Sequence, residues 1–292
     1  MSLVSNIIFR ISVALILLYT LTTHNTAFGS ACCSASSQVP TLITSDSVMQ
    51  LGLRTARSSV IGSSGPNTTS RFYNHERSDI TYRLELLGAY ALNDRWQLNA
   101  SIPLTKRVRR LDTAEAEHWG LSTVALGGSY ELVPEIEYSS WKPRVFLFAS
   151  IGLPLSNSDE ARLDLGTHIH GSTSLVKTAG FFLLKQFNTV DWNLLLAQAH
   201  DAFYTSVASV GFGWHGPEGL RLGVNIGPTY QFGSGLLGQN RLVIDTSFNL
   251  GLSFFDDYSL NINYLDQTLF GPTKNSELSR VVNLLFLRRF DL

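Results

Sequence analysis

The sequence is short of charge. Only 15% of its 292 residues are Asp, Glu, Lys or Arg, whereas soluble domains carry about 25%. Hydrophobic residues make up 44%, so apolar residues are unusually abundant relative to charged ones. The net charge of −1 and the pI near 6.7 argue against the basic surface that binds nucleic acid. We therefore expect no nucleic-acid partner.

Long apolar runs are also scarce. One run, Ile11–Leu21, follows a single basic residue, but a spanning helix needs about 20 apolar residues. Small residues come next, in Ala27–Ala31, as at a secretory cleavage site. We expect residues 1–31 to be a signal peptide that is cleaved after Gly29 or Ala31. The rest of the chain contains no uninterrupted apolar run of about 18 residues, so no transmembrane helix is expected there.

Cysteine is almost absent, and the two cysteines, Cys32 and Cys33, are adjacent. Adjacent Cα atoms lie about 3.8 Å apart, closer than the usual disulfide partners. The remainder of the chain can therefore hold no disulfide. Cleavage after Ala31 would leave Cys32 first, which makes Cys32 a candidate lipidation site. The alternative is two free thiols on a flexible N-terminal segment, residues 32–47.

The chain does contain long alternating segments. Every second residue of Leu220–Phe232 is apolar, and Leu242–Phe254 repeats the pattern almost throughout. This period predicts strands with one apolar and one polar face. The segments exceed the five or six residues of a typical globular strand, and they suit strands that cross a bilayer. In the first segment we expect Leu222, Val224 and Ile226 to face lipid.

Alternation and turn residues together predict twelve strands within residues 48–292. Their approximate ranges are 48–57, 78–92, 95–105, 120–132, 143–155, 172–187, 191–202, 206–215, 219–232, 241–255, 258–270 and 278–292. The predicted fold is all-β: an antiparallel transmembrane β-barrel in the bacterial outer membrane, with both termini periplasmic. Ten or fourteen strands, and a secreted β-sandwich, are the alternatives.

The connections alternate in length. Tight ones, such as Asn93-Asp94 and Asp256-Asp257, fit short periplasmic turns. The segments Ser58–Arg77, Lys106–Trp119 and Ser156–Gly171 are long and polar, and are expected to be outer loops. The second of these loops contains a basic cluster made of Lys106, Arg107, Arg109 and Arg110. That cluster either binds lipopolysaccharide or pairs locally with Asp112, Glu115 and Glu117.

Short motifs add a family resemblance. They are the hairpin Leu92–Leu98 with the strand end Ile102-Pro103-Leu104, the strand opening Gly120-Leu121-Ser122, the strand end Gly152–Leu155, and the cysteine pair with Pro40–Thr44. Together they resemble outer-membrane transporter-like barrels that are related to the phenol-degradation meta-pathway family. The resemblance implies a barrel with a transport role. The apolar alternation that ends at Phe290 also resembles the signal by which such barrels are recognised, so the barrel assembly machinery is an expected partner, beside outer-membrane lipid.

The polar face should line the barrel interior. The expected lumen-lining residues are Arg54, Arg83, Glu85, Gln97, Asn99, Glu131, Arg144, Arg221, Asn225, Asp245 and Asn249, with Asn261 and Asn263 on a further strand. Rings of opposite charge would make a selective channel or transporter for small molecules. Paired charges would instead close the interior. The alternative function is therefore a non-conducting structural or surface-recognition barrel, with Ser34–Ser47 as a candidate plug.

Enzymatic candidates are few. His170 and Ser172 could belong to a phospholipase-like barrel hydrolase, a remote alternative, but Leu184 occupies the position of the orienting residue. His168 and His170 share a strand face, and no third metal ligand accompanies them. We therefore expect no catalytic residues, no metal and no cofactor.

Overall fold

The computed structural model describes residues 41–44, 47–73, 77–111, 114–134, 142–155, 175–187, 189–200, 204–232, 240–255, 257–270 and 273–291. The expected signal peptide and Cys32 lie outside these residues. Fourteen strands are present among them: β1 (Met49–Ser64), β2 (Ser70–Phe72), β3 (Arg77–Ala91), β4 (Trp96–Leu111), β5 (Ala114–Leu121), β6 (Thr123–Val133), β7 (Arg144–Pro154), β8 (Val176–Gln186), β9 (Val190–His200), β10 (Tyr204–His215), β11 (Leu220–Phe232), β12 (Arg241–Phe254), β13 (Tyr258–Asp266) and β14 (Ser276–Phe290). Within the described ranges, no helix is long and apolar enough to span a membrane.

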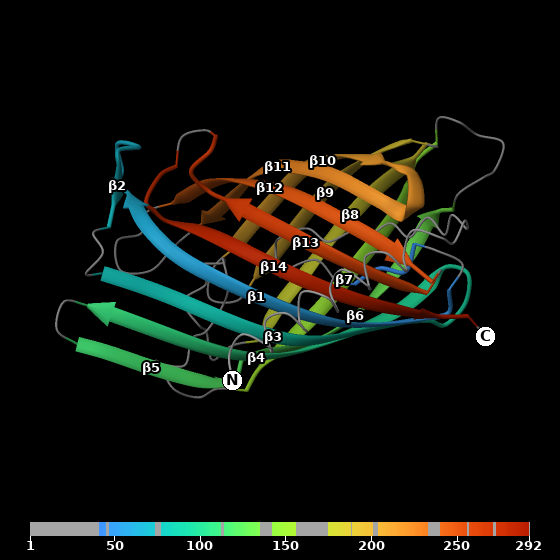
Figure 1. Ribbon diagram of the computed structural model, residues 1–292, viewed down its shortest axis with the longest axis horizontal. Coiled ribbons are helices and arrows are strands. Elements are labelled where there is room, and N and C mark those ends of the chain that lie inside the picture. Colours follow the sequence, from blue (N-terminus) through green and yellow to red (C-terminus); the bar gives the residue numbers. More distant parts are fainter. Residues whose placement is uncertain are drawn as a thin grey trace, which may run out of the picture.

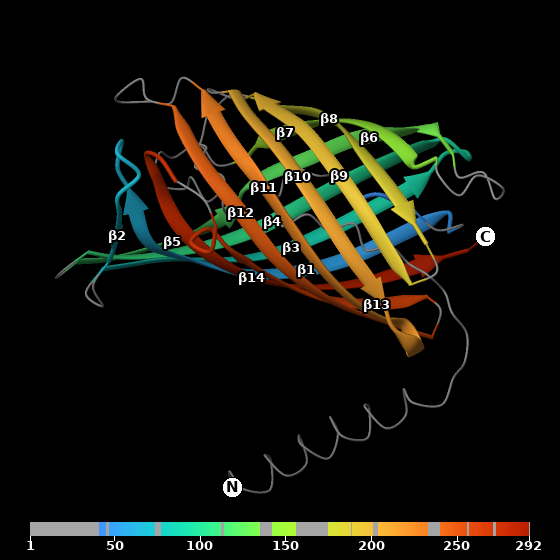
Figure 2. The ribbon, with the colours of Figure 1, turned by 90° about the horizontal axis from the view of Figure 1, so that it is seen from above.

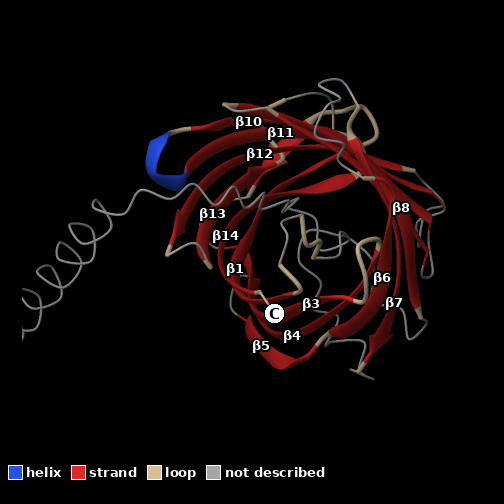
Figure 3. Cartoon of the chain, turned by 90° about the vertical axis from the view of Figure 1, so that its right-hand side faces the viewer, coloured by secondary structure: helices blue, strands red, loops and turns tan. Residues whose placement is uncertain are grey.

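The strands close into a barrel because the last one pairs with the first. β14 runs antiparallel to β1, from Met49 opposite Phe290 to Ser64 opposite Ser276. β5 and β6 follow one another along the same neighbour, β4, and so fill a single position in the wall. The short β2 pairs only with the end of β1. The wall therefore has twelve positions, which confirms the predicted twelve-stranded antiparallel barrel (Figures 1 and 3).

Several strands are longer than the sequence predicts. β1 continues to Ser64, and β4 continues to Leu111 before β5 begins at Ala114. The predicted outer loops Ser58–Arg77 and Lys106–Trp119 are therefore largely strand, and their expected bounds were wrong. Apolar alternation ends where lipid ends, whereas the backbone hydrogen-bond ladder also forms between strands with polar side chains. By contrast, β13 is shorter than predicted, because it ends at Asp266 instead of residue 270.

The two ends of the barrel differ. We call one the short-turn end, because the hairpin connections around residues 92–95, 187–189, 216–219 and 255–257 lie there. In one of these turns the Asn93 side-chain oxygen accepts hydrogen bonds from the backbone N–H groups of Arg95 (3.0 Å) and Trp96 (2.9 Å), which holds the chain in a tight reversal. The opposite end is the long-loop end. The strands tilt steeply between the two ends (Figure 2).

The outer face of the barrel is an exposed apolar belt. On β11, Leu222, Val224 and Ile226 are 45%, 38% and 40% exposed, as expected for lipid-facing positions. Neighbouring strands contribute exposed leucines and phenylalanines in the same manner, including Leu84 and Phe286. An apolar surface of this extent requires a bilayer, and only a closed barrel satisfies every strand hydrogen bond in lipid. The protein is thus an outer-membrane type of barrel.

Candidate functional site: the barrel interior

The expected lumen-lining residues occupy alternate positions that point away from the apolar belt. Five of them are buried, namely Arg83, Glu85, Gln97, Asn99 and Glu131. The other six are partly buried, namely Arg54, Arg144, Arg221, Asn225, Asp245 and Asn249. On β13, Asn263 is buried and Asn261 is partly buried. The strand period therefore places each of these polar side chains in the interior of a closed sheet.

A charged triad lies on β1 and β3. Glu85 accepts from Arg54 Nη1 at 3.1 Å and from Arg83 Nη2 at 2.8 Å. The Glu85 side chain is only 3% exposed, and those of Arg54 and Arg83 are 15% and 6% exposed. Arg54 is directly opposite Glu85 in the β1–β3 register, so the backbone ladder itself brings this pair together. The triad carries one excess positive charge within the wall.

Two further ion-pair groups lie near the short-turn end. Arg144 binds Glu131 through Nε at 2.7 Å and through Nη2 at 3.1 Å, a two-point contact between β7 and β6. On β9, Asp191 accepts from Arg221 at 2.7 Å and lies 2.6 Å from His215 Nε2. Asp191 and His215 were not among the expected lumen residues. They flank the turns, where alternation is hard to recognise.

A glycine makes room for the Asp191 carboxylate. A Cβ atom at Gly213 would lie 2.7 Å from both Asp191 side-chain oxygens. Any larger residue at this position of β10 would therefore displace the carboxylate from His215 and Arg221. The close approach of the carboxylate to the backbone explains the small residue in this strand.

Each carboxylate of these three groups is paired with a cation along the wall. Arg54 and Glu85 lie on neighbouring strands, as do Glu131 and Arg144, and Asp191 with His215. The geometry therefore does not produce facing rings of opposite sign from these residues. Each carboxylate is neutralised by an adjacent cation, so its field across the interior is weak.

Amide and hydroxyl groups line β11 to β14. The Asn263 side chain donates to Asn249, and Asn283 donates to Asn263 at 3.5 Å. Nearer the long-loop end, Asp245 accepts from Thr229 at 2.7 Å and from Gln267 at 2.8 Å. Gln267 in turn accepts from the Ser279 hydroxyl at 2.7 Å. This side of the interior is polar, and it also holds charged side chains, among them Asp245 and the buried Arg289.

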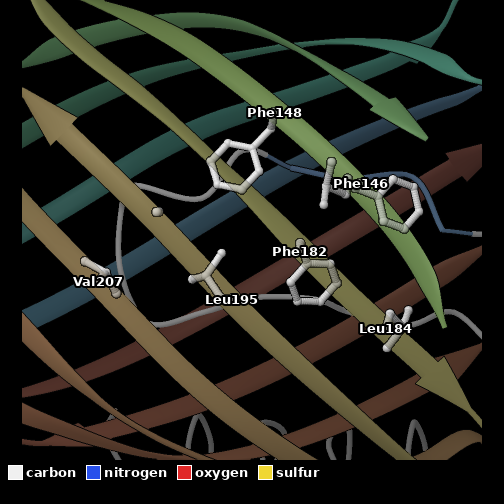
Figure 4. Close-up of a cluster of buried hydrophobic side chains, with 8 residues drawn as sticks. Phe146, Phe148, Phe182, Leu184, Leu195 and Val207 are labelled. Carbon is white, nitrogen blue, oxygen red and sulfur yellow. The ribbon is translucent and has the colours of Figure 1, made fainter. Parts of the chain in front are cut away.

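The adjoining part of the wall, β7 to β10, is apolar, which was not expected from the sequence. Figure 4 shows the side chains that project inward from β7 to β10. They form one buried cluster with Leu42: Phe146, Phe148, Phe182, Leu184, Leu195, Ala197 and Val207. The available signal was the loss of alternation in the unbroken apolar runs Phe181–Leu184 and Leu194–Ala197. Such runs indicate strands that are apolar on both faces.

A segment preceding β1 lies inside the barrel. Ile43 donates from its backbone N–H to Gln97 Oε1 at 2.9 Å, and the Gln97 amide donates to the Ile43 carbonyl at 2.8 Å. Arg144 Nη1 donates to the Thr44 carbonyl at 2.5 Å. Leu42 and Ile43 are only 4% and 2% exposed. Within the expected N-terminal plug, residues 41–44 therefore contact interior side chains of β4 and β7.

The remaining sequence candidates contribute little to this interior. His168, His170 and Ser172 lie outside the described residues. Leu184 belongs to the apolar cluster. In the basic cluster, Arg107 and Arg109 pair with Asp79, at 2.5 and 3.1 Å, and Arg110 pairs with Glu115 at 2.7 Å. No group of three or more His, Cys, Asp or Glu residues in the described part of the chain is arranged to hold a metal ion.

Comparisons with known proteins show the fold. No protein family matches the sequence, and no curated protein matches it either. Among solved structures, the COG4313 outer membrane channel from Pseudomonas putida F1 superposes with a TM-score of 0.68 at 12% identity, covering 88% of this chain and 100% of that one. The translocator domain of the autotransporter NalP from Neisseria meningitidis gives 0.48 at 9% identity, covering 83% and 88%. The CymD monoaromatic hydrocarbon channel gives 0.41 at 11% identity, covering 84% and 89%.

At 12% identity, the first of these similarities establishes a shared architecture and nothing more specific. The family resemblance in the sequence motifs therefore stays a prediction. The twelve-stranded closure, the apolar belt and this structural similarity agree with each other. They identify the chain as a β-barrel of the bacterial outer-membrane kind.

Proposed function

We propose that this protein is a channel or transporter that passes small molecules through the barrel, and that these molecules are partly apolar. One observation carries the proposal: the interior has an apolar side on β7 to β10 and a polar side on β11 to β14. A solute with an aromatic or aliphatic part and a polar group would find a matching surface for each. The carboxylates of the ion-pair groups are paired with cations, and the triad keeps one excess positive charge, so a solute with a single carboxylate is compatible with the wall and a cationic solute is not favoured.

Residues 41–44 would control passage. Three hydrogen bonds attach the backbone of this segment to Gln97 and Arg144, and Leu42 contacts the apolar cluster. The two bonds with Gln97 contribute about 1 kcal/mol net each, and the bond from the charged Arg144 contributes about 1.5–3 kcal/mol. Burial of Leu42 and Ile43 adds about 1.5–3 kcal/mol each. Displacement of the segment therefore costs several kcal/mol, and a bound solute would have to offset it.

Single-channel conductance in planar bilayers tests the role of the segment. The full chain should conduct weakly, and Leu42→Asp combined with Gln97→Ala should raise the conductance several-fold. The physical reason is that a carboxylate cannot remain among phenylalanines without a partner. Thr41→Ser is the matched control and should leave conductance unchanged. Equal conductance of all three proteins would refute control by this segment.

Liposome swelling tests the solute class. We expect aromatic acids to enter faster than sugars of similar size, and Phe182→Asn to reduce that difference. Phe182 is 4% exposed and points inward, so its replacement changes the interior alone. The control, Phe248→Leu, alters a residue on the lipid-facing side that is 45% exposed. Equal rates for sugars and aromatic acids in the unmodified protein would contradict the proposed solute class.

A non-conducting barrel is the second candidate. The observation that favours it is the attachment of residues 41–44 to side chains of two separate strands, β4 and β7. This candidate predicts no conductance from the full chain and none from the Leu42→Asp, Gln97→Ala variant. The same bilayer recordings therefore distinguish the two functions.

A further inference from the structure

A cluster of basic side chains lies on the outer face of the barrel. Arg57 on β1, Lys106 on β4 and Arg280 on β14 are all exposed and occupy outward positions. In the β1–β14 register, Arg57 is opposite Val282, and Arg280 is opposite Ser59. The two arginines are therefore diagonal neighbours on one face, about 7–8 Å apart and within reach of each other's long side chains. We call these three residues the basic patch.

Lys106 completes the patch across β3. Tyr82 is opposite Arg57 on one side and opposite Lys106 on the other. The two cations are thus two strand spacings apart, or about 10 Å. Tyr82 is 42% exposed between them, and Trp119, opposite Lys106 on β5, is 74% exposed. Exposed Tyr and Trp of this kind are typical of the membrane–water interface.

The height of the patch places it where the apolar belt ends. Trp96, at the short-turn end of β4, precedes Lys106 by ten residues, and Arg280 precedes Phe290 on β14 by the same number. Ten strand residues span about 33 Å, which becomes about 25 Å along the axis of a barrel whose strands tilt by about 40°. The apolar band of outer-membrane barrels is about 25 Å tall. The patch therefore lies at the level of lipid headgroups.

The basic patch contains hydrogen-bond donors that are not used by neighbouring residues. Arg280 uses Nε to contact Asp266 at 2.8 Å, and its side chain is 49% exposed while that of Asp266 is 2% exposed. Asp266 is held in turn by the Tyr264 hydroxyl (2.9 Å) and the Thr268 backbone N–H (2.7 Å). Arg280 is thus positioned through Nε, and its two terminal amino groups form no hydrogen bond with another described residue.

The charge balance of the patch is positive. Lys106 pairs with Glu117 at 2.7 Å, and both side chains are about half exposed, so solvent weakens that contact. The side chain of Arg57 forms no hydrogen bond or ion pair with another residue in the part of the chain that the structure describes. With Asp266 and Glu117 set against three cations, one positive charge is left without a counterion.

We propose that the basic patch binds a phosphate group of lipopolysaccharide in the outer leaflet. In bacterial barrels the short turns are periplasmic, which places the long-loop end, and the patch, toward the outside. Guanidinium groups bind phosphate through two parallel hydrogen bonds. The arginines first suspected from the sequence, Arg107, Arg109 and Arg110, already pair with carboxylates. This site is independent of the transport proposal.

Native mass spectrometry of the full chain in detergent micelles, with bisphosphorylated lipid A as the probe, tests the site. Loss of a charge-assisted contact should weaken lipid A retention about tenfold for Arg57→Gln, and further for Arg57→Gln with Arg280→Gln. The matched control is Arg288→Gln. Arg288 lies on the same face of β14 at the short-turn end, where it stacks on Tyr258 and Phe290 at 5.4 and 4.6 Å. Its loss should leave retention unchanged.

Each outcome is decisive. Arg57→Gln removes a side chain without an internal partner, so it should fold normally, which a heat-modifiability gel verifies. Dephosphorylated lipid A should bind every protein as weakly as the double variant binds the phosphorylated form. Wild-type retention by the Arg57→Gln protein, or an equal loss in the Arg288→Gln protein, overturns the site. Equal retention of phosphatidylglycerol overturns the assignment to lipopolysaccharide.

Discussion

Replacing Glu85 by alanine should lower the free energy of unfolding by about 3–5 kcal/mol, because it leaves two guanidinium groups in the wall without a counterion. Arg54 and Arg83 both donate to this carboxylate, and the three side chains are 15% exposed or less. The Arg83 Nε atom already has no hydrogen-bond partner among the described residues. Further loss of an acceptor therefore adds to an existing desolvation cost. Urea unfolding of the barrel in lipid vesicles measures the change.

Two controls separate charge from packing at this position. Glu85→Gln keeps the shape and one acceptor oxygen, so we expect a smaller loss than for alanine. Arg54→Met removes one of two cations and leaves Glu85 paired with Arg83 at 2.8 Å, so it should cost least. If Glu85→Ala were no more destabilising than Arg54→Met, the arginines would be hydrated rather than dependent on Glu85.

Replacing Val224 by arginine should destabilise the barrel by about 2–4 kcal/mol, the cost of a basic side chain near the middle of a bilayer. Val224 lies in the central part of β11, points outward and is 38% exposed. In a soluble protein such an exposed position would tolerate a charge. The predicted loss therefore depends on lipid at this face. Unfolding in vesicles and the folded fraction on a heat-modifiability gel both report it.

The controls for Val224 test the environment rather than the residue. Val224→Leu should be nearly neutral, because it keeps the position apolar. Asp94→Arg adds an arginine in an exposed turn at the short-turn end, where surface substitutions change stability by about 0.5 kcal/mol or less. An arginine that is tolerated at Val224 as well as at Asp94 would mean that this face of β11 does not contact lipid.

Much of the fold was predictable because a lipid-facing strand imposes a strict rule on its sequence. On β11 the apolar residues Leu222, Val224 and Ile226 alternate with Arg221 and Asn225. This period alone assigns the apolar residues to lipid and the two polar residues to the interior. The rule fails where the barrel departs from a simple polar interior. Phe182 and Leu195 face inward, and in their strands both faces are apolar. In such strands alternation does not indicate which side chains face lipid and which face the interior.

Strand ends were less predictable for a different reason. The pairing of β4 with β5 extends over Arg107 to Arg110, which are polar residues outside the apolar belt. Backbone hydrogen bonds stabilise that ladder, and side-chain hydrophobicity does not mark it. The pairing of Asp79 with Arg107 across β3 and β4 follows from this extension. A loop in this region would have left the same arginines free for other partners.

The sequence by itself determined that the chain forms a membrane barrel of about twelve strands, because alternation and turn residues are local properties. Only the tertiary structure decided which side chains meet. The contacts of Glu85 with two arginines and of Gln97 with the backbone of Ile43 depend on strand register and closure. The position of Arg57 diagonal to Arg280 depends on them too. Register joins residues that are distant in the chain, and the pairing of β1 with β14 joins its two ends. No local pattern encodes that proximity, so the ion-pair groups of the interior and the basic patch are visible only in the folded barrel.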